Sequence, residues 1–155
     1  MEKISKITSF TVDHDKIEVG IYISRIDGDI TTYDLRTRKP NAGDYLDDIT
    51  MHSVEHMLAT YLRNSAISDS VIYFGPMGCR TGFYLLTRNL SNETVLKELM
   101  LALEKTISHE GEIFGNTQKE CGNYKCLSLE SAKLECQKYL TALKSIKNID
   151  FKYQQ

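Results

Sequence analysis

Hydrophobic residues follow two different spacings along this chain. Loose alternation rich in β-branched and aromatic residues predicts four strands, over residues 17–25, 30–37, 71–74 and 82–88. Apolar residues at helical spacing predict three helices, capped in turn by Asp48, by Ser91 or Asn92, and by Ser128. Asp27-Gly28-Asp29 favours a hairpin between the first two strands. Because strands and helices do not alternate regularly, we expect an α+β fold with a largely antiparallel sheet packed with helices, as a single domain over residues 1–155.

Composition excludes several classes of protein. The chain has 155 residues, of which 41% are hydrophobic and 26% charged, as in globular rather than disordered proteins. Its net charge of −2 lacks the basic excess of a nucleic-acid-binding protein, and no apolar run approaches the roughly 18 residues of a membrane span. We therefore expect neither a nucleic-acid nor a membrane partner.

The first six residues contain no apolar stretch after their charges, so we expect no secretory signal and a cytoplasmic location. In that reducing compartment cysteines are better explained as ligands, catalysts or core residues than as disulfides. The chain has four of them, Cys79, Cys121, Cys126 and Cys136.

The most specific local motif is His52-Ser53-Val54-Glu55-His56, which has the form H-x-x-E-H. On a helix that turns about 100° per residue, the two imidazoles and the carboxylate lie within an arc of roughly 100°. Two imidazoles one turn apart can bind one divalent metal ion, while the carboxylate transfers protons without being a ligand. Two surface histidines beside a solvated glutamate are the simpler alternative for these five residues.

A catalytic zinc site needs a third protein ligand and one open position. Cys121 is a candidate because it lies in a flexible polar turn, and two imidazoles with one thiolate suit zinc, or iron(II) under reducing conditions. Two alternatives stay open. Cys126 would add a second thiolate and close a structural site in a small binding module. An inverzincin-type protease would instead use a downstream glutamate, with Glu104, Glu110 and Glu112 as candidates.

Cys79 is a second candidate reactive group, in the segment 75–82, where glycines on both sides allow the backbone to approach a ligand. A thiol beside Arg80 is a plausible base or nucleophile, although an ordinary half-buried cysteine after a turn explains the position as well. Arg36, at the end of a strand, is a candidate anion or hydroxyl binder or else a solvated charge. Ser9 and His14 stand out in no local pattern.

Together these residues resemble the S-ribosylhomocysteine lyase (LuxS) family over nearly the whole chain. Each motif is weak alone, but five in the family's order and at about its spacings are specific. They are Ser9-Phe10 with Asp13-His14, Asp34-Leu35-Arg36 with Pro40-Asn41, His52-x-x-Glu55-His56, Pro76-Met77-Gly78-Cys79-x-Thr81-Gly82, and Cys121-Gly122.

The resemblance implies one divalent metal ion per subunit, iron(II) or zinc, with water in the fourth position and three protein ligands, His52, His56 and Cys121. It implies a pair of general acid/base groups, Glu55 and Cys79. It implies further groups that bind the substrate or position Cys79, namely Arg36, Ser9 and His14. The family is a homodimer with its sites at the subunit interface, and N-terminal residues reach the neighbour's site.

The implied reaction cleaves the thioether of S-ribosylhomocysteine to homocysteine and 4,5-dihydroxy-2,3-pentanedione, the precursor of autoinducer-2. The C–S bond at C5 is inert until the carbonyl has moved from C1 to C3, which acidifies the C4 proton and allows β-elimination. Each shift needs a base, a proton donor and a Lewis acid for the enediolate charge. Two departures concern substrate contacts: Arg38 stands where many members have cysteine, and residues 71–75 are less polar than expected.

Overall fold

The structure is a computed structural model that describes residues 2–155. Met1, which belongs to the N-terminal segment in which we expect no secretory signal, lies outside the described residues. Within these residues there are four strands and three α-helices. The strands are β1 (Gly20–Asp27), β2 (Ile30–Arg36), β3 (Val71–Pro76) and β4 (Gly82–Arg88). The helices are α1 (Asp48–Arg63), α2 (Asn92–Ile107) and α3 (Leu129–Ser145), with short 3-10 turns at Thr8–Phe10 and Ser68–Ser70.

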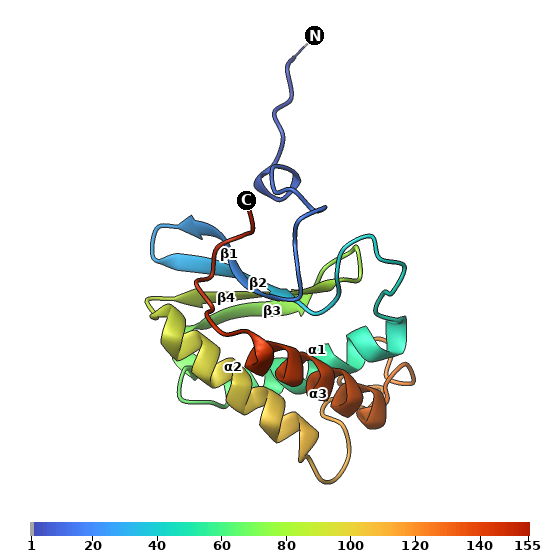
Figure 1. Ribbon diagram of the computed structural model, residues 1–155. Coiled ribbons are helices and arrows are strands. Elements are labelled where there is room, and N and C mark those ends of the chain that lie inside the picture. The colour runs from blue at the N-terminus through green and yellow to red at the C-terminus, as the bar shows by residue number, and fades with distance from the viewer. Residues whose placement is uncertain (1) are drawn as a thin grey trace.

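The strands form one sheet in the order β1-β2-β4-β3, and each neighbouring pair is antiparallel. The predicted α+β class is therefore confirmed. The helices lie on one face of the sheet, and both chain ends lie toward the other face (Figure 1). Alternation along β2 separates the two faces: Tyr33 and Leu35 belong to the apolar core, whereas Asp34 and Arg36 point to the second face.

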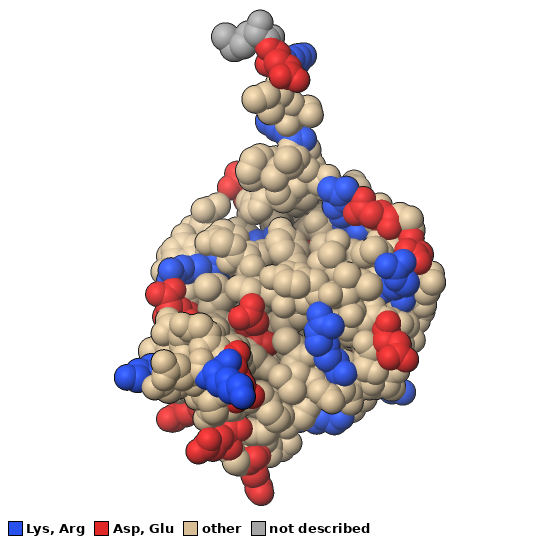
Figure 2. All heavy atoms as spheres, turned by 180° about the vertical axis from the view of Figure 1, so that it is seen from behind, with Lys and Arg blue, Asp and Glu red and all other residues tan. Residues whose placement is uncertain are grey.

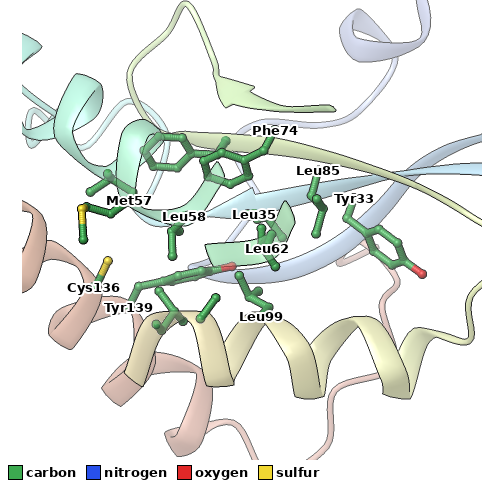
Figure 3. Packing of buried hydrophobic residues seen from close by; sticks show 14 of the residues in the cluster. Tyr33, Leu35, Met57, Leu58, Leu62, Phe74, Leu85, Leu99, Cys136 and Tyr139 are labelled. Atoms are coloured by element: carbon green, nitrogen blue, oxygen red, sulfur yellow. The ribbon is translucent and has the colours of Figure 1, made fainter. Parts of the chain in front are cut away.

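The core lies between the sheet and the helices (Figure 3). Helix α1 is in contact with α2, α3 and β3, so it is supported from several sides. It contributes Met57, Leu58 and Leu62, which meet side chains of the other elements, including Leu35, Phe74, Leu85, Leu99 and Tyr139. A helix packed in this way is a rigid support for polar residues elsewhere on its surface.

Several predicted boundaries are wrong, including the ends of the first three strands, which lie at Asp27, Arg36 and Pro76 rather than at residues 25, 37 and 74. Strand β1 begins at Gly20 rather than at Ile17, which is buried ahead of the strand. The cap of α1 is Asp47 rather than Asp48, since Asp47 Oδ1 accepts the Thr50 N–H at 2.7 Å. Adjacent aspartates fit the capping pattern equally well, so the sequence could not distinguish them. Ser128 caps α3, as predicted, and of the two candidates for α2 the cap is Ser91 rather than Asn92.

Arg38, one of the two departures from the family pattern, belongs to a buried ion pair. Its guanidinium donates to the Glu135 carboxylate on α3 through both terminal nitrogens, with Nη2 2.5 Å from Oε1. Burial lowers the pKa of Arg38, but the hydrogen bond and charge of Glu135 outweigh this effect and raise it overall. The pair ties the end of β2 to α3, and loss of either partner would leave a buried charge unpaired.

Charges are dispersed on the face that Figure 2 shows, where acidic and basic side chains lie interspersed around a central uncharged area. None of the helices in the described chain, residues 2–155, has the length and apolar character needed to cross a membrane.

Candidate metal centre

Helix α1 presents both imidazoles of the H-x-x-E-H motif. The His52 and His56 rings lie 4.5 Å apart, with their planes at 88°. His52 Nδ1 is 2.8 Å from the Cys126 carbonyl oxygen, and His56 Nδ1 is 2.8 Å from that of Phe114. Because a carbonyl oxygen only accepts, each Nδ1 carries the proton, and each Nε2 presents its lone pair.

Cys121 completes the group. Its Sγ lies 3.4 Å from His52 Nε2 and 3.7 Å from His56 Nε2. Tetrahedral zinc, with Zn–N of about 2.0–2.1 Å and Zn–S of about 2.3 Å, separates such donors by about 3.6 Å. The backbone N–H of Asn123 donates to Sγ at 3.4 Å, as expected for a ligand sulfur. The three residues therefore fit a divalent metal ion, which confirms that they can hold one.

The loops around α1 supply contacts that the sequence did not reveal. A Cβ added to Gly115 would lie 3.0 Å from His56 Nδ1, so a glycine is needed for the close approach of this loop; its φ of +68° also favours glycine. At the end of the same connection between α2 and α3, the Ser128 N–H donates to the buried Ser53 Oγ on α1 at 2.8 Å. The ligand residues are thus held by backbone groups, which leave no side-chain signature in a sequence.

The two alternative ligand sets find no support in the described part of the chain. Cys126 contributes its carbonyl to His52, and its thiol is not in the ligand group. The acidic candidates of an inverzincin-type site are also outside that group, namely Glu104, Glu110 and Glu112. Among residues 2–155 the group comprises His52, His56 and Cys121.

Cys79 is exposed on the turn between β3 and β4. This turn is tied to the start of α1: Arg80 Nη2 pairs with Asp48 Oδ1 at 2.7 Å, and the Arg80 carbonyl accepts the Leu46 N–H at 2.9 Å. Arg80 itself has a left-handed φ of +63°. The turn that carries Cys79 is therefore fixed against α1 at Asp48. Asp48 lies about one helical turn before His52 on that helix.

Two of the three glycines around Cys79, Gly75 and Gly82, have packing roles, whereas a Cβ on Gly78 would meet nothing within 4 Å. A Cβ on Gly82 would lie 2.3 Å from the Leu35 carbonyl oxygen, so strand β2 occupies that space. A Cβ on Gly75 would lie 2.0 Å from the Tyr73 hydroxyl, because the phenol lies over Gly75. The space beside these two glycines is filled by the protein itself, which differs from the expected approach to a ligand. Among residues 71–75, Tyr73 is 49% exposed and lines a hollow together with Thr32 and Tyr84.

Arg36 is 3% exposed rather than a solvated charge. It donates to Asp34 through Nε at 3.0 Å and Nη2 at 2.5 Å, and through Nη1 to Thr81 Oγ1 at 2.8 Å. Thr81 Oγ1 lies 3.0 Å from Cys79 Sγ. Burial lowers the pKa of Arg36, but the hydrogen bond and charge of Asp34 raise it overall. Arg36 is thus a permanent cation connected to Cys79 through one hydroxyl.

The remaining predicted residues, Ser9, His14 and Glu55, take no part in these contacts. Ser9 lies on the N-terminal 3-10 turn and lines a hollow on the second face together with Tyr73 and Tyr84. His14 Nδ1 donates to the Val12 carbonyl oxygen at 2.9 Å. Glu55 is half-buried on α1. Within residues 2–155, no hydrogen bond or ion pair joins these three to Cys79 or to the ligand group, so their roles stay predictions.

Comparison with known proteins decides the family. The model of the family described as S-Ribosylhomocysteinase (LuxS) matches residues 7–150. The chain belongs to the LuxS family. The S-ribosylhomocysteine lyase of Borreliella burgdorferi strain ZS7 is 44% identical over 156 residues, covering 97% of this chain and 99% of the relative. That of Phocaeicola vulgatus is 44% identical over 140 residues, covering 86% and 87%. The LuxS match spans every predicted site residue, from Ser9 to Cys121.

Proposed function

We propose that this LuxS-family protein cleaves S-ribosylhomocysteine to homocysteine and 4,5-dihydroxy-2,3-pentanedione, with one zinc or iron(II) ion per subunit. The convergence of two imidazole Nε2 atoms and the Cys121 sulfur, 3.4 and 3.7 Å apart, carries the proposal. S-ribosylhomocysteine lyase is also the name of the relatives that match most of this chain.

The ligand set suits a metal that must remain a Lewis acid. Two neutral imidazoles and one thiolate leave a net charge of +1 on a divalent ion. When bound, such an ion stabilises negative charge that develops on the sugar oxygens. The carbonyl groups of Cys126 and Phe114 fix the imidazole tautomers and leave both Nε2 atoms free to hold an ion together with Cys121.

Cys79 and Glu55 form the proposed acid/base pair. Each carbonyl shift removes a proton from one sugar carbon, returns one to its neighbour, and moves protons between two oxygens. The final elimination removes the C4 proton as the homocysteine thiolate leaves C5, and that thiolate then takes up a proton. A base for carbon and a donor for oxygen are needed in the same step, so a single group does not suffice.

Glu55→Gln is expected to fold and to bind metal like the wild type, because Glu55 is outside the ligand group. Turnover should fall by roughly 10²–10⁴, since an amide neither accepts nor releases a proton at neutral pH. Metal analysis and steady-state kinetics on the same preparation check this. An undiminished kcat would remove Glu55 from the mechanism.

Incubation of the metal-loaded protein with S-ribosylhomocysteine tests the activity directly. The expected result is stoichiometric release of a free thiol together with the pentanedione. The matched control is the same thioether reduced at C1, which has no carbonyl to move and should release nothing. A fully loaded protein that leaves S-ribosylhomocysteine intact would contradict the proposal, and peptide hydrolysis by that preparation would favour a protease.

We also propose a homodimer with its sites at the interface, which the exposed apolar residues of the N-terminal segment support. Ile4, Ile7 and Phe10 are 91%, 59% and 68% exposed on a segment that projects from the body (Figure 1). Apolar residues in such a position are best buried against a second copy of the chain. Light scattering should give twice the 17.7 kDa chain mass, and a fully active monomer would contradict the dimer.

The four free cysteines agree with the cytoplasmic location that we also propose.

A further inference from the structure

We propose that Thr81 positions Cys79 through a hydrogen bond from the Thr81 hydroxyl to the Cys79 sulfur. This bond is the last in a series of hydrogen bonds that begins at Tyr153. The inference rests on the proposed function, since it concerns how the acid/base thiol of that reaction is held. The series of hydrogen bonds links, in order, Tyr153, Asp34, Arg36, Thr81 and Cys79.

The direction of the hydrogen bonds follows from the chemistry of the partners. Thr81 Oγ1 is 2.8 Å from Arg36 Nη1 and 3.0 Å from Cys79 Sγ. A guanidinium N–H only donates, so Arg36 occupies a lone pair of the hydroxyl and leaves its proton free. A thiolate only accepts, so in that state the proton must come from Thr81. In the described chain these are the two partners of Thr81 Oγ1.

Thr81 is well fixed for this task. Its side chain is 2% exposed, and its carbonyl oxygen accepts the backbone N–H groups of Thr37 and Arg38, each at 3.0 Å. These contacts join the residue to the chain just after β2. The hydroxyl is therefore held by the protein rather than by exchanging water, and its position relative to Cys79 depends little on solvent.

The far end of the chain of hydrogen bonds is held by the C-terminal segment. Tyr153 donates its hydroxyl to Asp34 Oδ2 at 2.7 Å, and its ring stacks on Tyr22 with centroids 4.9 Å apart. Burial, and then the charge of Asp34, raise the pKa of Tyr153, so the phenol stays a donor. Asp34 is 1% exposed and holds the Arg36 guanidinium in two hydrogen bonds. Arg36 is thereby oriented toward Thr81.

The other charged or titratable groups near Cys79 do not replace Thr81. Arg80, next in sequence, is paired with Asp48 on α1. Tyr84 on β4 also faces this region, and burial raises its pKa, so it is neutral at neutral pH. The Arg36 guanidinium, on β2, does not bond the Cys79 sulfur directly. The Thr81 hydroxyl lies between the guanidinium and the sulfur.

Thr81→Val, which keeps the shape of the side chain and removes the donor, tests the proposal in the full-length, metal-loaded protein. Alkylation of Cys79 by iodoacetamide is followed against pH by site-resolved mass spectrometry. The pH of half-maximal alkylation should move up by roughly one to two units in Thr81→Val, whereas Thr81→Ser should behave like the wild type. Burial raises the pKa of Cys136 to about 12, so that thiol is an internal reference that stays unmodified.

Kinetics provide the second measurement. With S-ribosylhomocysteine at pH 7, Thr81→Val should lower kcat by roughly tenfold or more with little change in KM, and Thr81→Ser should restore it. Tyr153→Phe should shift the alkylation profile in the same direction by less. If Thr81→Val loses its fold or metal, Tyr153→Phe decides the question. A variant that folds and keeps the wild-type alkylation profile and kcat overturns the role of Thr81.

The two proposals can fail separately because alkylation needs no substrate. A wild-type protein that releases no thiol from S-ribosylhomocysteine would defeat the proposed function, while the alkylation profiles would still report on Thr81. Normal lyase activity with identical profiles in wild type and Thr81→Val would instead overturn only the role of Thr81.

Discussion

Cys121→Ala is expected to lose its metal ion and to lower turnover by about three orders of magnitude or more, since a metal supplies several kcal/mol of charge stabilisation. Cys121 Sγ is the one soft, anionic donor of the three-residue ligand group described above. Two imidazoles on one helix leave the ion with too few protein ligands for stable binding. Metal content after gel filtration, measured together with thiol release, checks this expectation.

Cys126→Ala is the matched control for this variant. Both changes remove one thiol from the same loop, but Cys126 holds His52 through its carbonyl oxygen, which alanine retains. Cys126→Ala should therefore keep the metal and most of the activity. Metal loss in both variants would indicate the closed two-cysteine site, and full metal in Cys121→Ala would remove Cys121 from the ligand set.

Cys79→Ala, unlike Cys121→Ala, is expected to keep its metal ion while it loses activity. The ion should stay, because Cys79 is outside the ligand group, whereas turnover should fall by roughly 10²–10⁴ or more, since one acid/base partner is missing. The exposed position of Cys79 makes a folding defect a poor explanation for lost activity.

Circular dichroism, metal analysis and thiol release on one preparation separate these effects. Cys126→Ala is again the control, since it removes a thiol that the mechanism does not use. Cys79→Ala with wild-type turnover would exclude the thiol from the reaction. Loss of metal in that variant would indicate that the turn between β3 and β4 takes part in metal binding.

The sequence predicts best what depends on local pattern. Strand β4, the caps Ser91 and Ser128, and the i, i+4 histidine pair follow from periodicity and side-chain chemistry. Cys121 was predicted because a thiol in a flexible turn can reach a helix-borne pair. The Asp47 cap was missed because two adjacent aspartates satisfy the same rule, and only backbone geometry distinguishes them.

Contacts between distant residues could not be predicted from one sequence. The Arg38–Glu135 pair spans 97 residues, and the Tyr153–Asp34 hydrogen bond spans 119. No periodicity relates such positions, and a charged residue near a strand end normally indicates exposure. The carbonyls that fix His52 and His56 are still harder to find, because every residue has a backbone carbonyl and the fold alone decides which one is used.

X-ray absorption spectroscopy at the metal edge of the purified, loaded protein tests the central claim most directly. The account predicts one sulfur scatterer at about 2.3 Å, two imidazole nitrogens at about 2.0–2.1 Å, and one further light atom from solvent. Addition of substrate should change the light-atom shell and leave the sulfur in place. Two sulfur scatterers, or a shell without sulfur, would contradict an ion held by His52, His56 and Cys121.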